Sequence, residues 1–351
     1  MMQPRERWLA LFENRKPDRQ VTDYWATGEF HAKLKQAVGI TGDNDEPLWE
    51  KLGIDRPFSV WPTWKLKHHP DDPQANEWGI RFATVNYGTG SYGEAVHFPL
   101  AKCNNAADVH AFHWPSPDDY DYSGIAARIR ANNGYRIVNG GSYEPFLLYC
   151  LMRGMEQAYE DLLVNQESSE AGLGHIFDFY YEQNRRIWQA GKIDMTYLAE
   201  DLGGQTGPLM SLESYRRFLL PNQKKMAELA RSFGLRVFYH TDGAARVFLS
   251  DLVNEVGINI LNPLQWRCPG MDLPGLVRDF GDRLIFHGGI DNQQTLAFGS
   301  VADVRREVRE AAAIMRNYRW ICAPCHNIQN ISPVANVLAM YETIKENTSC
   351  N

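Results

Sequence analysis

The sequence has no long hydrophobic run and only six cysteines among its 351 residues. No stretch approaches the roughly 18 apolar residues that a membrane-spanning helix needs, so we expect no membrane span. The apolar run near the N-terminus, WLALF, is shorter than the core of a signal peptide, which predicts a cytoplasmic protein. In that reducing compartment, we expect the scattered cysteines to be free thiols and not a disulfide framework.

Positive charge is also scarce, because 36 Lys and Arg residues stand against 43 Asp and Glu residues, for a net charge of −7. A mildly acidic chain has no general attraction for phosphate backbones or anionic lipids, so we expect neither nucleic acid nor a membrane as a partner. The GxGxxG, P-loop and GxSxG motifs are absent, which argues against nucleotide-binding folds and serine hydrolases. A globular protein that acts on a small molecule remains.

The second half of the chain alternates short β-branched runs with amphipathic stretches. Strands are predicted at Met195–Ala199, Arg236–His240, Ile258–Leu261, Leu284–His287 and Trp320–Pro324. The helices that follow them are predicted at Leu212–Phe233, Ala244–Val256, Leu273–Phe280, Val301–Met315 and Val334–Lys345. Strands that alternate with helices in this way pair in parallel through right-handed crossovers.

Three weaker strand candidates lie upstream, at Val21–Trp25, Phe58–Trp61 and Tyr135–Asn139, and they bring the number of strands to eight. Eight strand–helix units predict an α/β fold of the (β/α)₈ TIM-barrel type. The remaining length predicts an N-terminal helix over Arg5–Arg15 and an inserted hairpin within Trp78–Phe112. Since no linker divides the chain, we expect a single domain over residues 1–351. A doubly wound open sheet is the alternative, because periodicity alone does not show closure.

In a barrel, the residues that follow the strands form the active site. The candidates at these positions are Trp25, Tyr143, Glu144, Glu200, Asp201, Gln205, His240, Asp242, Asn262, Gln265, Asp291, His326 and Asn327. Polar residues also collect in loops as helix caps and turn formers, so each has a structural alternative.

The step His240-Thr-Asp242 is the most specific of these signals. Its two polar side chains are two residues apart at a strand end and can point the same way, while His326 ends the last strand. Two imidazoles and a carboxylate can hold a divalent metal and leave positions open for a substrate. The alternative is that Asp242 caps a helix and His240 is a core residue.

Two further motifs are better explained by structural roles than by chemistry. Cys322-Ala-Pro-Cys325 resembles a redox or zinc motif, but residues three apart on a strand face opposite ways, so core filling is the better hypothesis. His287 precedes Gly288-Gly289, which favours a tight turn, with a phosphate site as the weaker alternative.

Five stretches resemble the uroporphyrinogen decarboxylase superfamily, and the resemblance implies a (β/α)₈ barrel. They are RERWLALFENRKPDR, AEDLGGQTGPLMSLESYRRFLLP, YHTDG, INILNPLQWRCPGMDL with DRLIFHGGIDNQQTL, and APCHNIQNISPVANVLAMYE. One branch of this superfamily decarboxylates uroporphyrinogen without a cofactor. The other contains zinc-dependent methyltransferases that work with corrinoid proteins.

The resemblance favours the methyltransferase branch. No arginine lies between Arg19 and Arg56, where the decarboxylases carry an arginine-rich motif that matches their polycarboxylate substrate. The methyltransferases bind zinc through a His-x-Cys step and a later Cys, and His240, Asp242 and His326 occupy the corresponding positions. Carboxylate and imidazole in place of two thiolates make a harder metal centre, which suits an ether, hydroxyl or amine substrate and the demethylating direction.

The resemblance therefore implies a metal-dependent methyltransferase, with zinc as the expected divalent metal. It would move a methyl group between a small substrate and a corrinoid, and the corrinoid would come on a separate partner protein because the chain has no DxHxxG-type motif. Glu200 or Asp201 would orient the ligands or take a proton, and Trp25 and Tyr143 would form aromatic walls. The other strand-end candidates would contact the substrate: Glu144, Gln205, Asn262, Gln265, Asp291 and Asn327. The alternatives are a cofactor-independent decarboxylase of another carboxylic acid, with the same carboxylates as general acids, and a non-catalytic binding protein.

Overall fold

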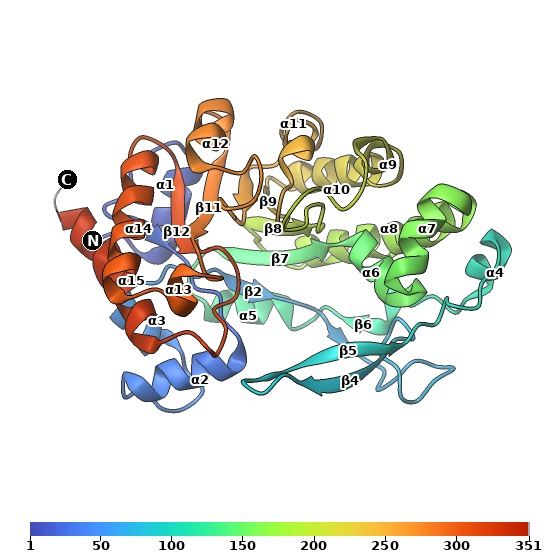
Figure 1. Ribbon diagram of the computed structural model, residues 1–351. Coiled ribbons are helices and arrows are strands. Elements are labelled where there is room, and N and C mark those ends of the chain that lie inside the picture. The colour runs from blue at the N-terminus through green and yellow to red at the C-terminus, as the bar shows by residue number, and fades with distance from the viewer. Residues whose placement is uncertain (350–351) are drawn as a thin grey trace.

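The computed structural model describes residues 1–349, with side chains to residue 346, and its centre is one curled sheet of eight parallel strands (Figure 1). Their spatial order is β1 (Val21–Thr22), β12 (Trp320–Pro324), β11 (Ile285–Ile290), β10 (Ile260–Asn262), β9 (Arg236–His240), β8 (Met195–Ala199), β7 (Val138–Tyr143) and β2 (Phe58–Val60). From β7 to β12, strands that are consecutive along the chain are neighbours in the sheet, and β2 and β1 pair with its two ends. A doubly wound sheet would reverse its order once, so that alternative is wrong and the TIM-barrel-like fold is confirmed.

The two ends of the ladder, β1 and β2, meet without a strand pair between them. The backbone N–H of Asp55, just before β2, donates to the carbonyl of Thr22 at 2.9 Å. The guanidinium of Arg56 donates to the carbonyl of Tyr24. Strand β1 is shorter than predicted because the Tyr24 N–H bonds the side chain of Asp23 at 2.7 Å, where a strand would bond its neighbour.

Helices cover the outside of the sheet (Figure 1). Those before β8 are α1 (Pro4–Phe12), α2 (Gly28–Ala37), α3 (Glu46–Leu52), α4 (Ala106–Ala111), α5 (Ile125–Ala131), α6 (Pro145–Arg153), α7 (Met155–Val164) and α8 (Gln166–Gln189). Those after β8 are α9 (Leu212–Phe218), α10 (Leu220–Ser232), α11 (Leu249–Asp251), α12 (Leu273–Phe280), α13 (Thr295–Phe298), α14 (Val301–Met315) and α15 (Val334–Ser349).

Two predicted helices differ in the structure. The stretch Leu212–Phe233 forms two helices, because Pro221 in the first turn of α10 lacks an N–H and disfavours helical geometry in the residue before it. The stretch Ala244–Val256 is a series of short turns, with α11 between a 3₁₀ turn and a π-helical turn at Leu252–Val256. The left-handed Gly257, at φ 74°, ends it.

The predicted inserted hairpin is β4 (Arg81–Asn86) and β5 (Ser91–His97), which pair antiparallel. A smaller pair, β3 (Thr63–Trp64) with β6 (Tyr120–Asp121), lies beside it. The hairpin tip reaches the first turn of α2 and the loop after β12. Ser91 N–H donates to Glu29 at 3.1 Å, and the Asn330 amide donates to the Thr89 carbonyl at 2.5 Å.

Helix α1 closes the opposite end of the barrel. Trp8, fully buried, donates its indole N–H to the carbonyl of Asp55 at 2.8 Å. Trp8 and Leu11 pack against one apolar side chain from most of the strands, namely Val21, Ile137 (just before β7), Met195, Phe238, Ile260, Ile285 and Ile321. The amino-terminal end of the barrel is thus filled with hydrocarbon, which leaves the carboxyl end for chemistry.

Predictions on the cysteines and on membrane spans can be compared with the described residues. Cys103, Cys150, Cys268, Cys322 and Cys325 are free thiols as predicted, while Cys350 lies outside the described residues. Cys322 and Cys325 are both buried, in agreement with core filling. Within residues 1–349, no helix is both long and apolar enough to cross a bilayer. The single-domain organisation stays a prediction.

Candidate metal centre

The turn after β9 directs Asp242 back toward His240, the last residue of that strand. Thr241 N–H donates to the Asn262 carbonyl at 2.7 Å, and Gly243 N–H donates to the Gln265 side chain at 2.7 Å. Gly243 has φ 70°, and a Cβ there would lie 2.3 Å from the Gly203 carbonyl oxygen. Only glycine fits this position, so the turn and the direction of Asp242 are fixed by the backbone.

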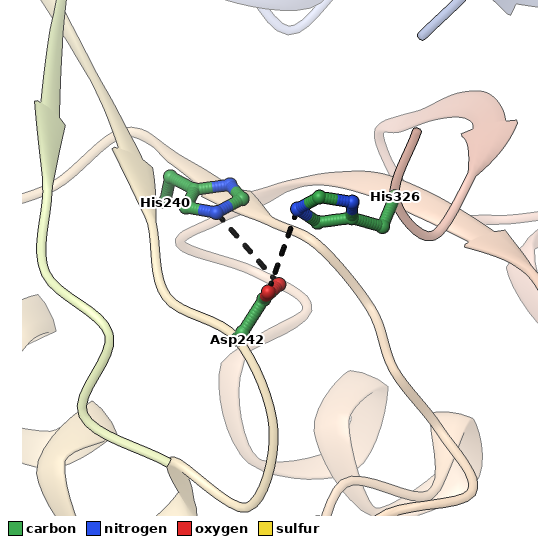
Figure 2. Close-up of side chains that lie close together, drawn as sticks. All are labelled: His240, Asp242 and His326. Carbon is green, nitrogen blue, oxygen red and sulfur yellow. Dashed lines mark ion pairs between the residues drawn. The ribbon is translucent and has the colours of Figure 1, made fainter. Parts of the chain in front are cut away.

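His240, Asp242 and His326 converge at the mouth of the barrel, as Figure 2 shows. His240 Nε2 lies 3.7 Å from Asp242 Oδ1, and His326 Nε2 lies 3.5 Å from Asp242 Oδ2. One donor atom from each residue lies within 4.8 Å of the other two. The carboxylate caps no helix, because the turn that follows starts without a side-chain cap. The structure therefore brings together the three residues predicted to bind metal.

Asp201 adds a further carboxylate beside His240. Its Oδ1 is buried, has no hydrogen-bond partner and lies 3.9 Å from His240 Nε2. A buried carboxylate oxygen without a donor is costly unless a cation meets it. The two imidazole nitrogens and the carboxylate of His240, His326 and Asp242 are a donor set that zinc accepts, so the residues present fit a divalent metal.

Glu200, the neighbour of Asp201, bonds the backbone at the start of α6. Its two oxygens accept from the backbone N–H groups of Phe146 and Leu147, at 2.7 and 3.0 Å, at the start of α6. Burial, with the nearby charge of Glu144 adding to it, raises the pKa of Glu200 well above its ordinary value. Of the two predicted catalytic carboxylates, Asp201 is the one that reaches the candidate metal centre.

Glu144 adds a further acidic group to the mouth. Burial raises its pKa to about 7; the charge of His240 opposes the rise, and Asp201 and Asp242 add to it. Burial also raises the pKa of Asp242, against the charges of His240 and His326. Mutual repulsion among these carboxylates is what a divalent cation relieves.

Two of the predicted substrate contacts, Gln205 and Gln265, form hydrogen bonds around the carboxylate of Asp242. Gln265 donates to Asp242 Oδ1 at 3.2 Å, accepts from Gly243 N–H, and lies 3.4 Å from the amide of Gln205. Cys268, which the sequence analysis did not select, donates weakly to both amides, with its sulfur 3.7 and 3.8 Å from their oxygens. Gln265 therefore orients Asp242.

Two predicted substrate contacts, Tyr143 and Asp291, have side chains that are engaged elsewhere. Tyr143 is buried, with its ring edge-on to Phe177 and Tyr180 of α8, because its position on β7 faces the helix layer. Asp291 caps the turn that leads into α13 through the N–H groups of residues 293–295, and it pairs with Arg267 at 2.7 Å. Neither side chain is free to contact a substrate. The side chain of Asn327, half-buried beside His326, stays a predicted contact.

Trp25, predicted to be an aromatic wall of the substrate pocket, lies beside the candidate metal centre. Its ring stacks on His240, with centroids 5.6 Å apart and an interplanar angle of 18°. Tyr197 also stacks on His240, at 5.9 Å. Both rings line a cavity of about 100 Å³ inside the barrel, together with Asp23, Arg56 and residues of the strands.

Three buried residues, Asn262, His287 and Asp23, extend a line of hydrogen bonds from His240 into the barrel. The sequence analysis did not select His287 and Asp23 as site residues. Asn262, predicted to contact substrate, has both ends of its amide occupied: Oδ1 lies 2.6 Å from His240 Nδ1, and Nδ2 lies 2.7 Å from His287 Nδ1. His287 Nε2 lies 3.0 Å from Asp23 Oδ2. Asp23 and His287 each follow an inward-facing apolar residue by two positions, a signal that was available in the sequence.

Comparison with solved structures finds the same architecture in a methyltransferase from Methanosarcina mazei. The two share 18% sequence identity over 99% of each chain, with a TM-score of 0.68. A putative vitamin-B12 independent methionine synthase from Listeria monocytogenes is 12% identical over 93% of this chain and 96% of its own, with a TM-score of 0.44. No curated protein matches the chain in sequence. The family model described as uroporphyrinogen decarboxylase (URO-D) matches residues 89–347, and the protein therefore belongs to the uroporphyrinogen decarboxylase family.

Proposed function

We propose that the protein is a metal-dependent methyltransferase that moves a methyl group between a small methylated substrate and a separate corrinoid protein. The observation that carries the proposal is the convergence of His240, Asp242 and His326 at the barrel mouth, with the unpartnered oxygen of Asp201 beside them. The chain also shares its fold, along its full length, with a methyltransferase from Methanosarcina mazei.

His240, Asp242 and His326 would hold the metal and leave a position open for the substrate, with Asp201 beside His240. A zinc ion bound there supplies a Lewis acid for an ether, hydroxyl or amine atom of the substrate. The donor set contains no thiolate, so it favours such hard atoms over a thiol, and the demethylating direction follows. Trp25 and Tyr197, stacked near His240, present flat apolar surface to the body of the substrate.

Glu144 is placed to manage the proton that demethylation requires. When a methyl group leaves an ether oxygen, the bonding electron pair stays on the oxygen, which then takes up a proton. Burial raises the pKa of Glu144 to about 7 in the metal-free protein, and this burial favours the protonated carboxyl that can donate to the oxygen. The same carboxyl can recover its proton from water through the open mouth.

Decarboxylation of uroporphyrinogen is the less supported alternative. Among the described residues that line the barrel cavity, Arg56 is the only arginine, and its guanidinium already donates to the Tyr24 carbonyl. A substrate with many carboxylates needs several cations to replace its water.

The test combines metal analysis with a methyl-transfer assay. Purified protein is analysed for zinc and then incubated with free cob(I)alamin and a panel of methoxyaromatic compounds and methylamines, while methylcobalamin formation is followed by absorbance. We expect one zinc per chain, and transfer that the His240→Ala variant lacks. A wild-type protein that binds no divalent metal after incubation with zinc, and yields no methylcobalamin, would contradict the proposal. Substrate binding without turnover would instead indicate a binding protein.

A further inference from the structure

Four buried side chains form a continuous hydrogen-bonded chain beneath the candidate metal centre. The chain runs from Asp23 through His287 and Asn262 to His240, with distances of 3.0, 2.7 and 2.6 Å. The exposed fractions of the four residues are 2, 0, 1 and 6%. They lie just after β1, on β11, and at the ends of β10 and β9, and we call them the Asp23–His240 chain. Nothing in the proposed reaction uses Asp23 or His287 directly.

The charge of Asp23 sets the direction of this chain. Burial opposes ionisation of Asp23, but the hydrogen bond from His287 and the charge of Arg56 hold its pKa below the ordinary value. The carboxylate also accepts from Tyr24 N–H at 2.7 Å and from the Trp25 indole at 3.0 Å. An ionised carboxylate accepts hydrogen bonds and donates none. His287 Nε2 must therefore carry a hydrogen.

The remaining hydrogens follow in order along the chain. A neutral imidazole that is protonated on Nε2 has a bare Nδ1, so His287 Nδ1 accepts from Asn262 Nδ2. The other end of that amide is an oxygen, so Asn262 Oδ1 accepts from His240 Nδ1. His240 then carries its hydrogen on Nδ1, and its Nε2 is bare. That Nε2 is the atom that lies 3.7 Å from Asp242 and 3.9 Å from Asp201.

We propose that Asp23, His287 and Asn262 are positioning residues that hold His240 in the tautomer with a bare Nε2, ready to bind the metal. This inference rests on the proposed metal-dependent function. Metal-binding histidines depend on the partner of their second nitrogen for both ring orientation and basicity. Here that partner is a neutral amide, and its own orientation is imposed by a carboxylate two hydrogen bonds further on.

Two variants of Asn262 separate positioning from packing. Asn262→Leu keeps much of the volume but removes the acceptor at His240 Nδ1, so the tautomer is no longer fixed. Asn262→Asp restores an acceptor at the same place and is expected to restore the tautomer. Asp23→Asn acts from the far end, because an amide can donate to His287 and allow the whole chain to reverse. A reversed chain places the hydrogen on His240 Nε2, where it blocks metal binding.

The first measurement needs no metal. Chelator-treated, ¹⁵N-histidine-labelled protein is studied at pH 8 by long-range ¹H–¹⁵N correlation, which distinguishes a protonated from a bare ring nitrogen. The His240 and His287 signals are assigned by their loss in His240→Gln and His287→Gln. We expect Nδ1–H on His240 and Nε2–H on His287 in the wild type and in Asp161→Asn, a control that disturbs a buried aspartate bonded to Arg153. The Nε2–H tautomer on wild-type His240 would overturn the inference.

The second measurement is zinc affinity by competition with a chromophoric chelator. We expect Asn262→Leu and Asp23→Asn to bind zinc roughly 10–100-fold more weakly than the wild type, the usual effect of losing such a partner. Asn262→Asp and Asp161→Asn should stay within a few-fold of the wild type. Equal affinity in all variants would overturn the inference even if the tautomer is as stated.

The two proposals fail in different ways. If the wild-type protein binds zinc tightly but His240 carries its hydrogen on Nε2 in the metal-free state, the inference fails and the metal-dependent function stands. If His240 has the stated tautomer but the wild type binds no divalent metal, the proposed function fails. Circular dichroism of each variant shows whether a loss of affinity has a simpler cause in unfolding, and Asn262→Asp then decides.

Discussion

Glu144 makes the metal-free protein lose stability as the pH rises, and Glu144→Gln should remove that loss. Burial raises the pKa of Glu144 from 4.5 to about 7 in the folded protein, with Asp201 and Asp242 adding to the shift. The folded state therefore holds the proton more tightly than the unfolded state. Below pH 4.5 both states are protonated and the contribution of Glu144 is at its most favourable. Stability is then lost as the pH rises through about 7.

The size of the loss follows from the two pKa values. Each pH unit of difference corresponds to about 1.4 kcal/mol, so the rise from 4.5 to about 7 corresponds to about 3 kcal/mol of lost stability at pH 8. At pH 5 only roughly 1 kcal/mol of it is lost, because the pH is barely above the unfolded value. Glutamine has the shape of glutamate and cannot ionise. Glu144→Gln should therefore gain stability over the wild type between pH 5 and pH 8.

Urea unfolding at 25 °C, followed by tryptophan fluorescence in EDTA, measures the effect. The quantity of interest is the difference in unfolding free energy between variant and wild type at each pH. Glu160→Gln, on the exposed face of α7, is the control and should follow the wild type. Saturating zinc should shrink the Glu144→Gln difference, because a nearby cation favours the ionised carboxylate. Parallel curves for Glu144→Gln and the wild type from pH 5 to pH 8.5 in EDTA would refute the reasoning.

The remaining predictions concern the metal and the substrate. His240→Ala and His326→Ala should each remove stoichiometric zinc, measured by elemental analysis, whereas Asp242→Ala should weaken binding and retain some metal, because water can fill one position. Asp242→Cys should shift the methyl acceptor preference toward thiols in a competition assay, since a thiolate ligand softens the metal. Cys322→Ala and Cys325→Ala should leave zinc content unchanged and reduce stability by about 1 kcal/mol, because both thiols fill the core. Incubation with uroporphyrinogen should yield no coproporphyrinogen by chromatography, and enzymatic formation would show that the protein belongs to the decarboxylating branch.

The barrel could be predicted because its strongest strands are continuous apolar runs. Strands β8, β9 and β12 have the predicted bounds, since they are buried on both faces between the core and the helices. The weakest predictions fall at the seam, where β1 and β2 have two and three residues. There, side-chain hydrogen bonds take the place of strand pairing. The Asp55 carboxylate accepts from Arg7, from Arg19 and from the backbone N–H of Thr22. Such contacts between distant residues leave no periodic signal in the sequence.

The metal-binding candidates could be predicted because all three follow strands whose positions were clear. Tyr143 and Asp291 were selected by the same rule, applied without regard to side-chain direction. Tyr143 ends β7 but faces the helices, and Asp291 follows β11 but turns back to cap the next segment. A position at a strand end indicates the mouth of the barrel, and the alternation along the strand decides which side chains enter it.

That alternation also explains the residues that were missed. The apolar layer at the closed end of the barrel contains one residue from most of the strands, and the side chain two positions later on the same strand points inward one layer higher. These second-layer residues are Asp23, Asn139, Tyr197, His240, Asn262, His287 and Ala323. Six of the seven are polar or carry a hydroxyl, and four of them form the Asp23–His240 chain. The apolar layer below keeps water from competing for these hydrogen bonds, so the direction that Asp23 imposes is transmitted through His287 and Asn262 to His240.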